Sequence, residues 1–507
     1  MILNWRNLEA IKPTADLKVP EVGMFDLPEK VLQFGTGVLL RGLPDYFIDK
    51  ANRQGIFNGR VVVVKSTDRG TTAEFDDQDG LYTLCVRGIE EGQKVEENII
   101  CAAISRVLTA GTQWDEILEV ATSTHLEVIL SNTTEVGIQL VDDDIFARPP
   151  VSFPGKLLAV LVARYKRFVG DSSKGLVIVP TELVPGNGDK LKAIVLEQAR
   201  RHQLDAGFLN WLEQSIIFCN SLVDRIVPGK PDDEALAALQ ASLGYQDELL
   251  AMSEVYRLWA IAGDERVKKV LTFAQADAGV IIAPDIDMYR ELKLRLLNGT
   301  HTMSCGVAFL AGFDTVKQAM DDPTLSGFVA ALMQEEIAPA IPYPVPAEAS
   351  SQFARQVLDR FRNPHIKHQW ISISLSFTAK LKLRVIPVLS RYYEVFGQAP
   401  ELLALGFAAY LRFMRAEETE GGKYYGLLQG VRYPINDDQA AYFYQLWQQQ
   451  DPHGLVDAVL QNQELWGLDL TTLPGFAQAV KKKLAAIEQD GVLKAIQDLE
   501  VKQVSAI

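Results

Sequence analysis

Short apolar runs alternate with longer amphipathic segments along the first part of the chain. From about residue 30, runs rich in Val, Ile and Leu are separated by stretches with apolar residues at helical spacing. This alternation is typical of a parallel sheet whose faces are covered by helices. The strands predicted from it are 30–34, 60–65, 99–107, 127–131 and 175–179. We therefore expect an α/β fold in the N-terminal part.

The pattern changes after about residue 190, where Leu, Ala, Gln and Glu at helical spacing become dominant. Near Pro284 an extended stretch, VIIAPDID, ends and a helical stretch, MYRELKLRLL, begins. The apolar segment 401–415 is shorter than the roughly 18 residues that a membrane span needs, so it reads as a buried helix. We predict two domains, residues 1–284 with the parallel sheet and residues 285–507 with mostly α-helical structure.

A glycine loop follows the first predicted strand, in the sequence VLQFGTGVLLRG. Gly35 and Gly37 stand where a Rossmann-type dinucleotide fold needs a tight turn and a bare backbone near the pyrophosphate. The third glycine of that pattern is replaced by Leu40. We interpret the segment as a dinucleotide-binding loop, with a methyltransferase-type nucleotide fold as the alternative. The predicted contacts are Val31, Leu32, Gln33, Phe34, Gly35, Thr36, Gly37, Val38, Leu39, Leu40, Arg41 and Gly42.

Polar residues follow two further predicted strands. Asp68, beyond the second strand, could bind the ribose hydroxyls of NAD, whereas Lys65 and Arg69 would suit the 2′-phosphate of NADP. These residues leave the choice of coenzyme open. Asn132 and Thr133 follow the fourth strand, at the sheet edge where open α/β folds bind ligands. We include Asp68, Asn132 and Thr133 in the coenzyme site, although the last two could instead cap a helix.

Charge and cysteine usage restrict the possible partners. The chain has 507 residues and a net charge of −15, from 50 Lys and Arg against 65 Asp and Glu. This balance argues against nucleic acid, whose binding depends on neutralised phosphates, and any anionic ligand must therefore be met by a local cationic pocket. The 4 cysteines are scattered, and the N-terminal segment does not resemble a secretory signal. We expect a cytoplasmic protein that acts on a small molecule and binds neither nucleic acid nor membrane. The sequence does not indicate its oligomeric state.

The segment KLRLLNGTH places three chemically useful side chains close together in sequence. At about 100° per residue, Lys293, Asn298 and His301 lie at about 0°, 140° and 80° around an α-helix. Hydride transfer between an alcohol and a nicotinamide needs a base for the hydroxyl proton, a donor to the developing alkoxide and a group that orients the substrate. Lysine, asparagine and histidine can supply these functions in that order. The alternative is a solvated lysine followed by an Asn-Gly helix stop. Spacing alone does not decide between them.

Several separate segments resemble one enzyme family. VLQFGTGVLLR, QDGLYTL, VDRI, KLRLLNGTH and FRNPHIKHQ occur in the order seen in the polyol-specific long-chain dehydrogenases, the mannitol dehydrogenase family. The segments SNTTEVGI, TELVPGNGDKL and DLTTLPG are similar to members that act on sugar acids. This resemblance covers nearly the whole chain. It implies a zinc-independent, NAD-dependent oxidoreductase with an N-terminal Rossmann-type domain, a helical C-terminal domain and an active site between them.

The resemblance also implies roles for individual residues. Lys293 corresponds to the catalytic lysine, Asn187 and Asn298 to the asparagines that hold the carbonyl oxygen, and His301 to a histidine that orients a sugar hydroxyl. Ser372 and Arg290 replace an arginine and a glutamate of the mannitol enzymes, which favours a hexuronate over a neutral hexitol. A carboxylate needs a cation, and the candidates are Lys380, Lys367, His368 and Arg384. His365 and His368 stand at i and i+3 without an evident third ligand, so no metal site is predicted.

Overall fold

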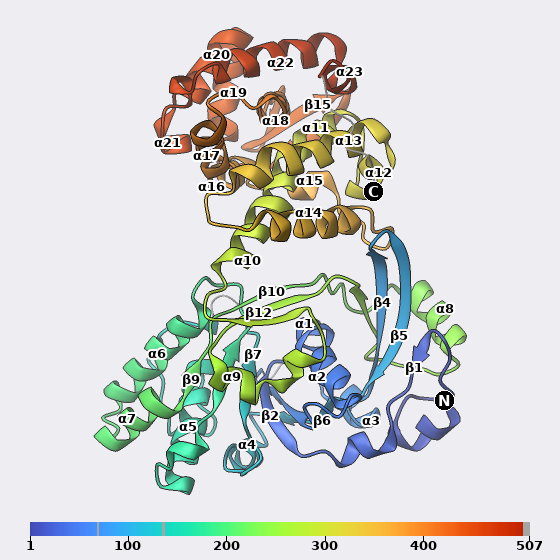
Figure 1. Cartoon of the computed structure of the whole chain (residues 1–507), viewed down its shortest axis with the longest axis vertical. Coiled ribbons are helices and arrows are strands. Elements are labelled where there is room, and N and C mark those ends of the chain that lie inside the picture. The colour runs from blue at the N-terminus through green and yellow to red at the C-terminus, as the bar shows by residue number, and fades with distance from the viewer. Residues whose placement is uncertain (68–69, 134–136, 500–507) are drawn as a thin grey trace. The chain divides into compact units, whose positions relative to one another are not determined.

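The structure, a computed structural model, describes residues 1–67, 70–133 and 137–499. The chain forms two compact units (Figure 1). The first comprises Met1–Gly88 and Lys94–Ile286, and the second comprises Ile89–Gln93 and Asp287–Ile507. The short segment Ile89–Gln93 therefore belongs to the unit formed by the C-terminal part of the chain.

A six-stranded parallel sheet forms the centre of the first unit. Its strands are β2 (Glu29–Phe34), β3 (Arg60–Lys65), β6 (Ile104–Thr109), β7 (Val128–Ser131), β8 (Val177–Pro180) and β9 (Ile217–Phe218), in the order β6-β3-β2-β7-β8-β9. Numbered within the sheet, this order is 3-2-1-4-5-6, the strand order of the Rossmann fold. The order reverses between β2 and β7, and ligands of such sheets bind outside the carboxyl ends of the strands at that point.

Both faces of this sheet are covered, as its nearly continuous apolar strands require. Leu32, Phe34 and Val62 pack in one cluster with α4 (Trp114–Ala121), α5 (Phe153–Phe168), α6 (Asn187–Arg201) and α7 (Ala206–Ser215). Val31 and Val63 face the other side, where they pack with α2 (Pro44–Asn52) and a second sheet. That sheet contains β10 (Ser221–Asp224), β12 (Leu258–Ala262) and β13 (Val280–Ala283). The predicted α/β Rossmann-type fold is confirmed.

One predicted strand is wrong in its extent. The run 99–107 is divided between β5 (Gln93–Cys101) and β6, which belong to different sheets. Between them Ala102 N donates to Asp49 Oδ1 at 2.8 Å, so the backbone leaves one sheet before it enters the other. A continuous apolar run does not reveal such a division, because both sheets are buried. The other sheet has the order β1-β5-β4-β11, with β1 (Leu17–Lys18), β4 (Tyr82–Glu90) and β11 (Ala251–Glu254).

The remaining helices complete the first unit. They are η1 (Trp5–Ala10), η2 (Val22–Asp26), α1 (Val38–Gly42), α3 (Ala73–Asp77), η4 (Ser172–Lys174), α8 (Asp233–Leu243), α9 (Glu265–Val270) and η5 (Thr272–Gln275). Side chains cap the starts of α5, α7, α8 and α9. At the start of α5, for example, Ser152 accepts a hydrogen bond from Gly155 N at 3.0 Å, and Pro154 occupies the first turn.

The second unit is mostly helical, as predicted. Its helices are α10 (Asp287–Leu292), η6 (Lys293–Gly299), α11 (Thr300–Leu310), α12 (Val316–Asp321), α13 (Pro323–Ala331), η7 (Leu332–Ile337), η8 (Ala338–Ala340), α14 (Ala347–Phe361), α15 (Trp370–Ile373), α16 (Phe377–Arg384), α17 (Ile386–Phe396), α18 (Glu401–Phe413), α19 (Ala440–Gln449), α20 (Pro452–Leu460), α21 (Gln463–Trp466), η9 (Leu470–Thr472), α22 (Phe476–Asp490) and α23 (Val492–Gln497). An antiparallel sheet of β14 (Glu418–Glu420), β15 (Lys423–Leu428) and β16 (Val431–Ile435) was not predicted.

Two glycines bring α11 and α18 into close contact. A Cβ atom on Gly306 of α11 would lie 3.0 Å from the backbone of Ala409, and one on Gly406 of α18 would lie 2.3 Å from the Met303 side chain. Most residues of α18 are buried, as the sequence predicted for this segment. This packing fixes α11, the helix that carries His301.

Candidate active site

The glycine loop lies at the switch point of the Rossmann sheet. Gly35 directly follows β2 and has a φ of +132°, a conformation that side chains rarely adopt. A Cβ atom there would also lie 3.0 Å from Asn132 O, in the segment after β7. The glycine is therefore required by the backbone itself, because β2 and β7 meet at this turn.

Gly37 differs from Gly35 in a way that points to a ligand. Its φ of −65° suits any residue, and a Cβ atom on it would meet no protein atom within 4 Å. Neither the backbone nor the packing of the described residues demands glycine at this position. Close approach of a ligand to the main chain does explain it, and the pyrophosphate of a dinucleotide needs such a bare backbone. The residues present thus fit a bound dinucleotide.

The other predicted coenzyme residues have different environments. The strand residues Val31, Leu32, Gln33 and Phe34 and the helix residue Leu40 are 0% exposed, so their side chains do not reach a ligand in this structure. Arg41 is also buried, and its Nη1 donates to Leu249 O at 2.5 Å. At Gly42, a Cβ atom would touch Val227. Thr36, Val38 and Leu39 are half-buried, and Gly37 is exposed.

The carboxyl end of β7 is organised by a buried acid. Glu182, 3% exposed, accepts hydrogen bonds from Thr133 N and Thr133 Oγ1 at 2.8 and 3.0 Å, and from Ser131 Oγ at 3.2 Å. Asn132 donates to Thr181 Oγ1 at 2.9 Å. The sequence analysis did not include Glu182 in the site. The feature that could have revealed Glu182 in the sequence is an acid two residues after the buried strand β8, at the same sheet edge as the predicted polar cluster.

Two predicted residues have environments that bear on their roles. Asn187 is fully buried at the start of α6, and its Nδ2 donates to the carbonyl oxygens of Pro180, Glu182 and Ser221 at 3.0 to 3.1 Å. In this structure its amide hydrogens are occupied by the main chain. Asp68 lies outside the described residues. Lys65 is buried, and its ammonium group donates to Thr67 O at 2.5 Å.

Lys293 and Asn298 lie in a π-helix, which continues α10 and leads into α11. The wider turn changes the angles expected for an α-helix, so the arithmetic based on 3.6 residues per turn does not hold here. Asn298 O accepts a hydrogen bond from Thr302 Oγ1 at 2.8 Å, and Arg384 Nη1 donates to the same hydroxyl at 3.0 Å. Asn298 and Arg384, 86 residues apart in sequence, are thereby brought together.

His301 lies in a compact group of rings. Its imidazole stacks on Phe361 at a centroid distance of 4.0 Å and meets His368 edge-on at 5.0 Å. The side chain is 9% exposed, and its Nε2 has no hydrogen-bond partner in the described part of the chain. Burial lowers the pKa of His301 well below its usual value, and four nearby bases lower it further. His301 is therefore neutral at physiological pH, with one ring nitrogen unoccupied by protein.

Bases gather around this histidine. The groups that act on its charge are His368, Arg360, Arg384 and Lys380, in order of effect. Burial, followed by the Arg384 charge, lowers the pKa of Lys380, whose Nζ donates to Ile373 O at 2.9 Å. Burial likewise lowers the pKa of His368. Lys367, in contrast, is exposed. Such a concentration of basic groups stabilises a bound anion.

Arg360 was not predicted from the sequence. It is 7% exposed near the end of α14, one residue before the Phe361 ring that stacks on His301. The feature that could have revealed Arg360 in the sequence is its position on the apolar face of an amphipathic helix. The same face carries Phe353 and Val357. A charge on such a face needs a partner or a function.

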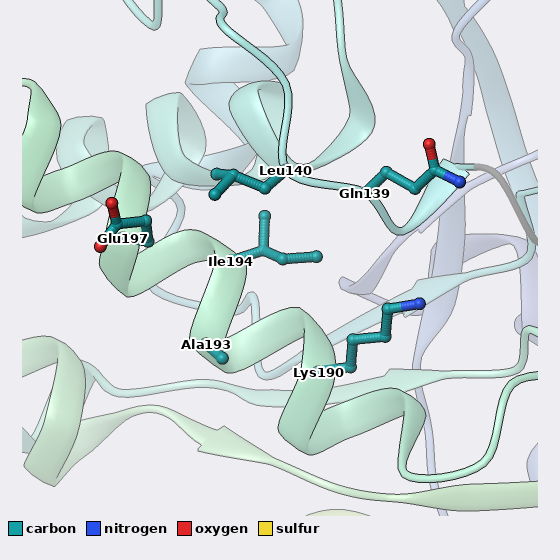
Figure 2. A pocket seen from close by; sticks show the side chains of 6 residues that line it. All are labelled: Gln139, Leu140, Lys190, Ala193, Ile194 and Glu197. Carbon is teal, nitrogen blue, oxygen red and sulfur yellow. The ribbon is translucent and has the colours of Figure 1, made fainter.

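A pocket of about 490 Å³ lies elsewhere in the first unit (Figure 2). Leu140 and Ile194 face each other across it, and Gln139, Lys190, Ala193 and Glu197 complete its lining. None of the predicted coenzyme or substrate residues belongs to it. The polar groups that suit the expected chemistry lie at the switch point and around His301, so we assign this pocket no role in the reaction.

No helix among the described residues is long and apolar enough to cross a membrane. The described residues also contain no group of three or more His, Cys, Asp or Glu side chains that could hold a metal ion. All four cysteines are buried free thiols.

Comparison with known proteins agrees with this architecture. Residues 29–274 match the mannitol dehydrogenase Rossmann domain, and residues 285–488 match the mannitol dehydrogenase C-terminal domain. The chain is 40% identical over 475 residues to the altronate oxidoreductase of Bacillus subtilis, covering 93% of this chain and 95% of the relative. It is 38% identical over 479 residues to that of Yersinia pestis, covering 92% and 96%.

Solved structures share the fold. A ternary complex of Pseudomonas fluorescens mannitol 2-dehydrogenase with NAD and D-mannitol has a TM-score of 0.65 at 23% identity, covering 98% of this chain and 99% of that chain. A substrate-free D-sorbitol dehydrogenase has a TM-score of 0.77 at 20% identity, covering 98% and 100%. With both domain models and full-length relatives in agreement, this chain belongs to the mannitol dehydrogenase family.

Proposed function

We propose that this protein is an NAD-dependent oxidoreductase that interconverts tagaturonate and altronate in hexuronate catabolism. The observation that carries the substrate assignment is the group of bases around His301. The four groups with the largest effect on the charge of this histidine are all basic, and Arg360 and His301 are largely buried. A neutral hexitol has no charge to offer such a group, whereas a hexuronate brings one carboxylate. The names of the relatives, altronate oxidoreductases, agree with a sugar acid.

The coenzyme assignment rests on the glycine loop. The exposed backbone at Gly37, the required turn at Gly35 and the 3-2-1-4-5-6 sheet order together suit a dinucleotide. NAD in the related ternary complex supports the same choice here. When bound, the nicotinamide accepts or supplies the hydride. We assign coenzyme contacts to the loop 31–42 and to Asp68, Asn132 and Thr133.

The proton is assigned to Lys293. Reduction of a ketone needs a group that gives a proton to the carbonyl oxygen, and the reverse reaction needs a base that removes it. A lysine side chain can serve in both directions. The amide of Asn298 would stabilise the oxygen as it gains charge, and the neutral imidazole of His301 would fix a neighbouring hydroxyl through its Nε2.

Asn187 is the weaker candidate for the second donor to this oxygen. Its three main-chain hydrogen bonds would have to be exchanged before its amide could reach a substrate. Four residues are candidates for binding the substrate carboxylate. Lys380, Arg384 and His368 lie in the group of bases around His301, and Lys367 is exposed and directly precedes His368 in the sequence. A cytoplasmic location fits the four free thiols.

The test is a comparison of substrates. We expect NADH oxidation to be fastest with tagaturonate, slower with fructuronate and slowest with the neutral ketoses fructose and tagatose. A charge-assisted contact of roughly 1.5 to 3 kcal/mol corresponds to about 10- to 150-fold in kcat/KM between tagaturonate and tagatose. Equal rates with both would contradict the carboxylate assignment, and faster turnover of fructuronate would identify the other uronate as the substrate.

A further inference from the structure

Two buried polar side chains meet directly behind the glycine loop. Gln33 is on β2, two residues before Gly35, and Asp45 is in the first turn of α2. Both side chains are 0% exposed. Gln33 Nε2 donates a hydrogen bond to Asp45 Oδ2 at 3.2 Å. The pair therefore joins the strand that enters the loop to the helix that follows it.

The second carboxylate oxygen of Asp45 and the single amide oxygen of Gln33 lack a partner among the described residues. Asp45 Oδ1 and Gln33 Oε1 are both buried, and neither makes a hydrogen bond within the described residues. A buried polar atom without a partner is costly, and most are satisfied in folded proteins. An ionised carboxylate cannot satisfy Gln33 Oε1, because it has no hydrogen to donate. A proton on Asp45 would satisfy both oxygens, since the O–H would donate to the amide oxygen.

We propose that Asp45 is a protonated, uncharged carboxylic acid at pH 6 and below, and that the acid–amide pair it forms with Gln33 positions the glycine loop for the coenzyme. Asp45 is thus a positioning residue, which acts through β2 and not by touching the ligand. The second half of this statement rests on the proposed coenzyme site. The first half, the protonation state of Asp45, stands independently of it.

The groups that face Asp45 are consistent with a neutral acid. Burial raises the pKa of Asp45 to about 7, although the Gln33 hydrogen bond and the Arg41 charge both lower it. Arg41, on α1, is directed elsewhere: it donates to Leu249 O, and its guanidinium lies over the rings of Phe75 and Tyr82 at 5.6 and 5.5 Å. Tyr82, on β4, donates to Arg41 O at 2.7 Å, and burial raises its pKa well above the usual value. It therefore brings no charge.

The direction of the pH effect follows from the raised pKa. An acid whose pKa is 3.8 in the unfolded chain and about 7 in the folded protein binds its proton more tightly when folded. Its contribution to stability is therefore complete below pH 3.8, declines as the pH rises to about 7, and stays at its lowest value above that. Above pH 7 the proton is lost, the bond to Gln33 Oε1 breaks, and the loop loses its support.

Asp45→Asn is the informative variant. Its amide resembles the neutral acid, because Nδ2 can donate to Gln33 Oε1 while Oδ1 accepts from Gln33 Nε2. Asp49→Asn is the matched control. Asp49 lies one turn further along α2 and is 1% exposed, but it pairs with Arg53 at 2.7 Å and accepts from Ala102 N. The control thus removes a charge that has a cationic partner.

The experiment measures thermal unfolding of the coenzyme-free protein and the Kd for NADH between pH 6 and 8.5. We expect D45N to match the wild type near pH 6 and to exceed its Tm at pH 8.5, whereas D49N has a lower Tm throughout. The wild-type Kd should rise relative to that of D45N by about two- to tenfold over this range, the effect of one hydrogen bond. A Tm of D45N below that of the wild type at pH 8.5, or failure of D45N to fold, would overturn the proposal.

Infrared spectroscopy tests the protonation state without relying on stability. The difference spectrum between the wild type and D45N at pH 6 should contain the carbonyl stretch of a protonated carboxylic acid, whereas the D49N difference should contain carboxylate bands only. Carboxylate bands in the D45N difference would show that Asp45 is ionised. If NADH did not bind to the wild type at all, the coenzyme assignment would fail, while the unfolding and infrared results would still decide the state of Asp45.

Discussion

The imidazole of His301 is neutral because it is buried among other bases, and this limits what it can do. With a pKa well below the usual value it is not available as a proton donor near neutral pH. It can still orient a hydroxyl group through the unpaired Nε2. The proton that the reaction requires must then come from another side chain, which is the role proposed for Lys293.

Replacement of Lys293 tests that role. We expect Lys293→Ala to lower kcat by a factor of about 10² to 10⁴, the usual contribution of a general acid or base, with a nearly unchanged Kd for NADH. Lys317→Ala is the control, because Lys317 forms an ion pair with Asp321 on α12 and has no assigned role. Measured kcat values decide the outcome. A kcat of K293A within a few-fold of that of K317A would remove Lys293 from the mechanism.

A second prediction concerns the partner of the carboxylate. Lys380 acts on the charge of His301, whereas Lys367 is exposed. Lys380→Met should therefore reduce kcat/KM for tagaturonate by about 10- to 150-fold and for the neutral analogue tagatose much less. Lys367→Met should have the smaller effect on this ratio. Equal losses on both substrates would show that Lys380 serves the shared hydroxyl groups, and Arg384 and His368 would then be the next candidates.

Single residues also show what a sequence can and cannot predict. The glycine pattern correctly marked the turn after β2, because φ and close approach at Gly35 are local constraints. The burial of Arg41 and the main-chain bonds of Asn187 depend on partners more than 30 residues away, such as Leu249 and Ser221. Pattern and spacing carry no information on such partners.

Among the elements, the turn between β2 and α1 is the part of the coenzyme site that the structure describes in most detail. Gly37 has an ordinary φ and open space around its Cβ position. Gly37→Val should therefore fold normally but place a branched side chain against the bound pyrophosphate, raising the KM for NADH at least tenfold.

Gly23→Val provides the control for this variant. Gly23 lies in η2, and a Cβ atom there also meets no protein atom within 4 Å. It should leave the KM for NADH at the wild-type value. A KM of the Gly37 variant equal to that of the Gly23 variant, with both proteins folded, would place the coenzyme somewhere else.

Element types were easier to predict than their boundaries and their geometry. Four predicted strands, near residues 30, 60, 127 and 175, correspond to β2, β3, β7 and β8, since each is a short apolar run between polar segments. The run 99–107 was divided between two sheets, and η6 was not distinguished from an α-helix. A π-turn is defined by its backbone hydrogen bonds, which helical periodicity does not specify.

For the molecule as a whole, the net charge of −15 conceals the basic group around His301. The global charge argues against a nucleic-acid partner and requires local cations for any anionic ligand, but the position of those cations depends on how α11, α14 and α16 pack. Because the proposed proton carrier is a lysine side chain, activity should persist in EDTA. The check is the rate of NADH oxidation after prolonged incubation with the chelator. Inactivation that added zinc reverses would contradict the lysine mechanism.

The hairpin between β4 and β5 has a consequence for dividing the protein into parts. Its tip, Ile89–Gln93, belongs to the second unit, where Gly92 N donates to Asp359 Oδ2 on α14 at 3.3 Å. The chain therefore passes from one unit to the other three times, after Gly88, after Gln93 and after Ile286. A protease cut or a gene truncation at Ile286 would not release two complete halves. The N-terminal fragment would retain Ile89–Gln93, although these five residues belong to the second unit. The C-terminal fragment would lack this segment, which contacts the end of α14 that carries Asp359 and Arg360.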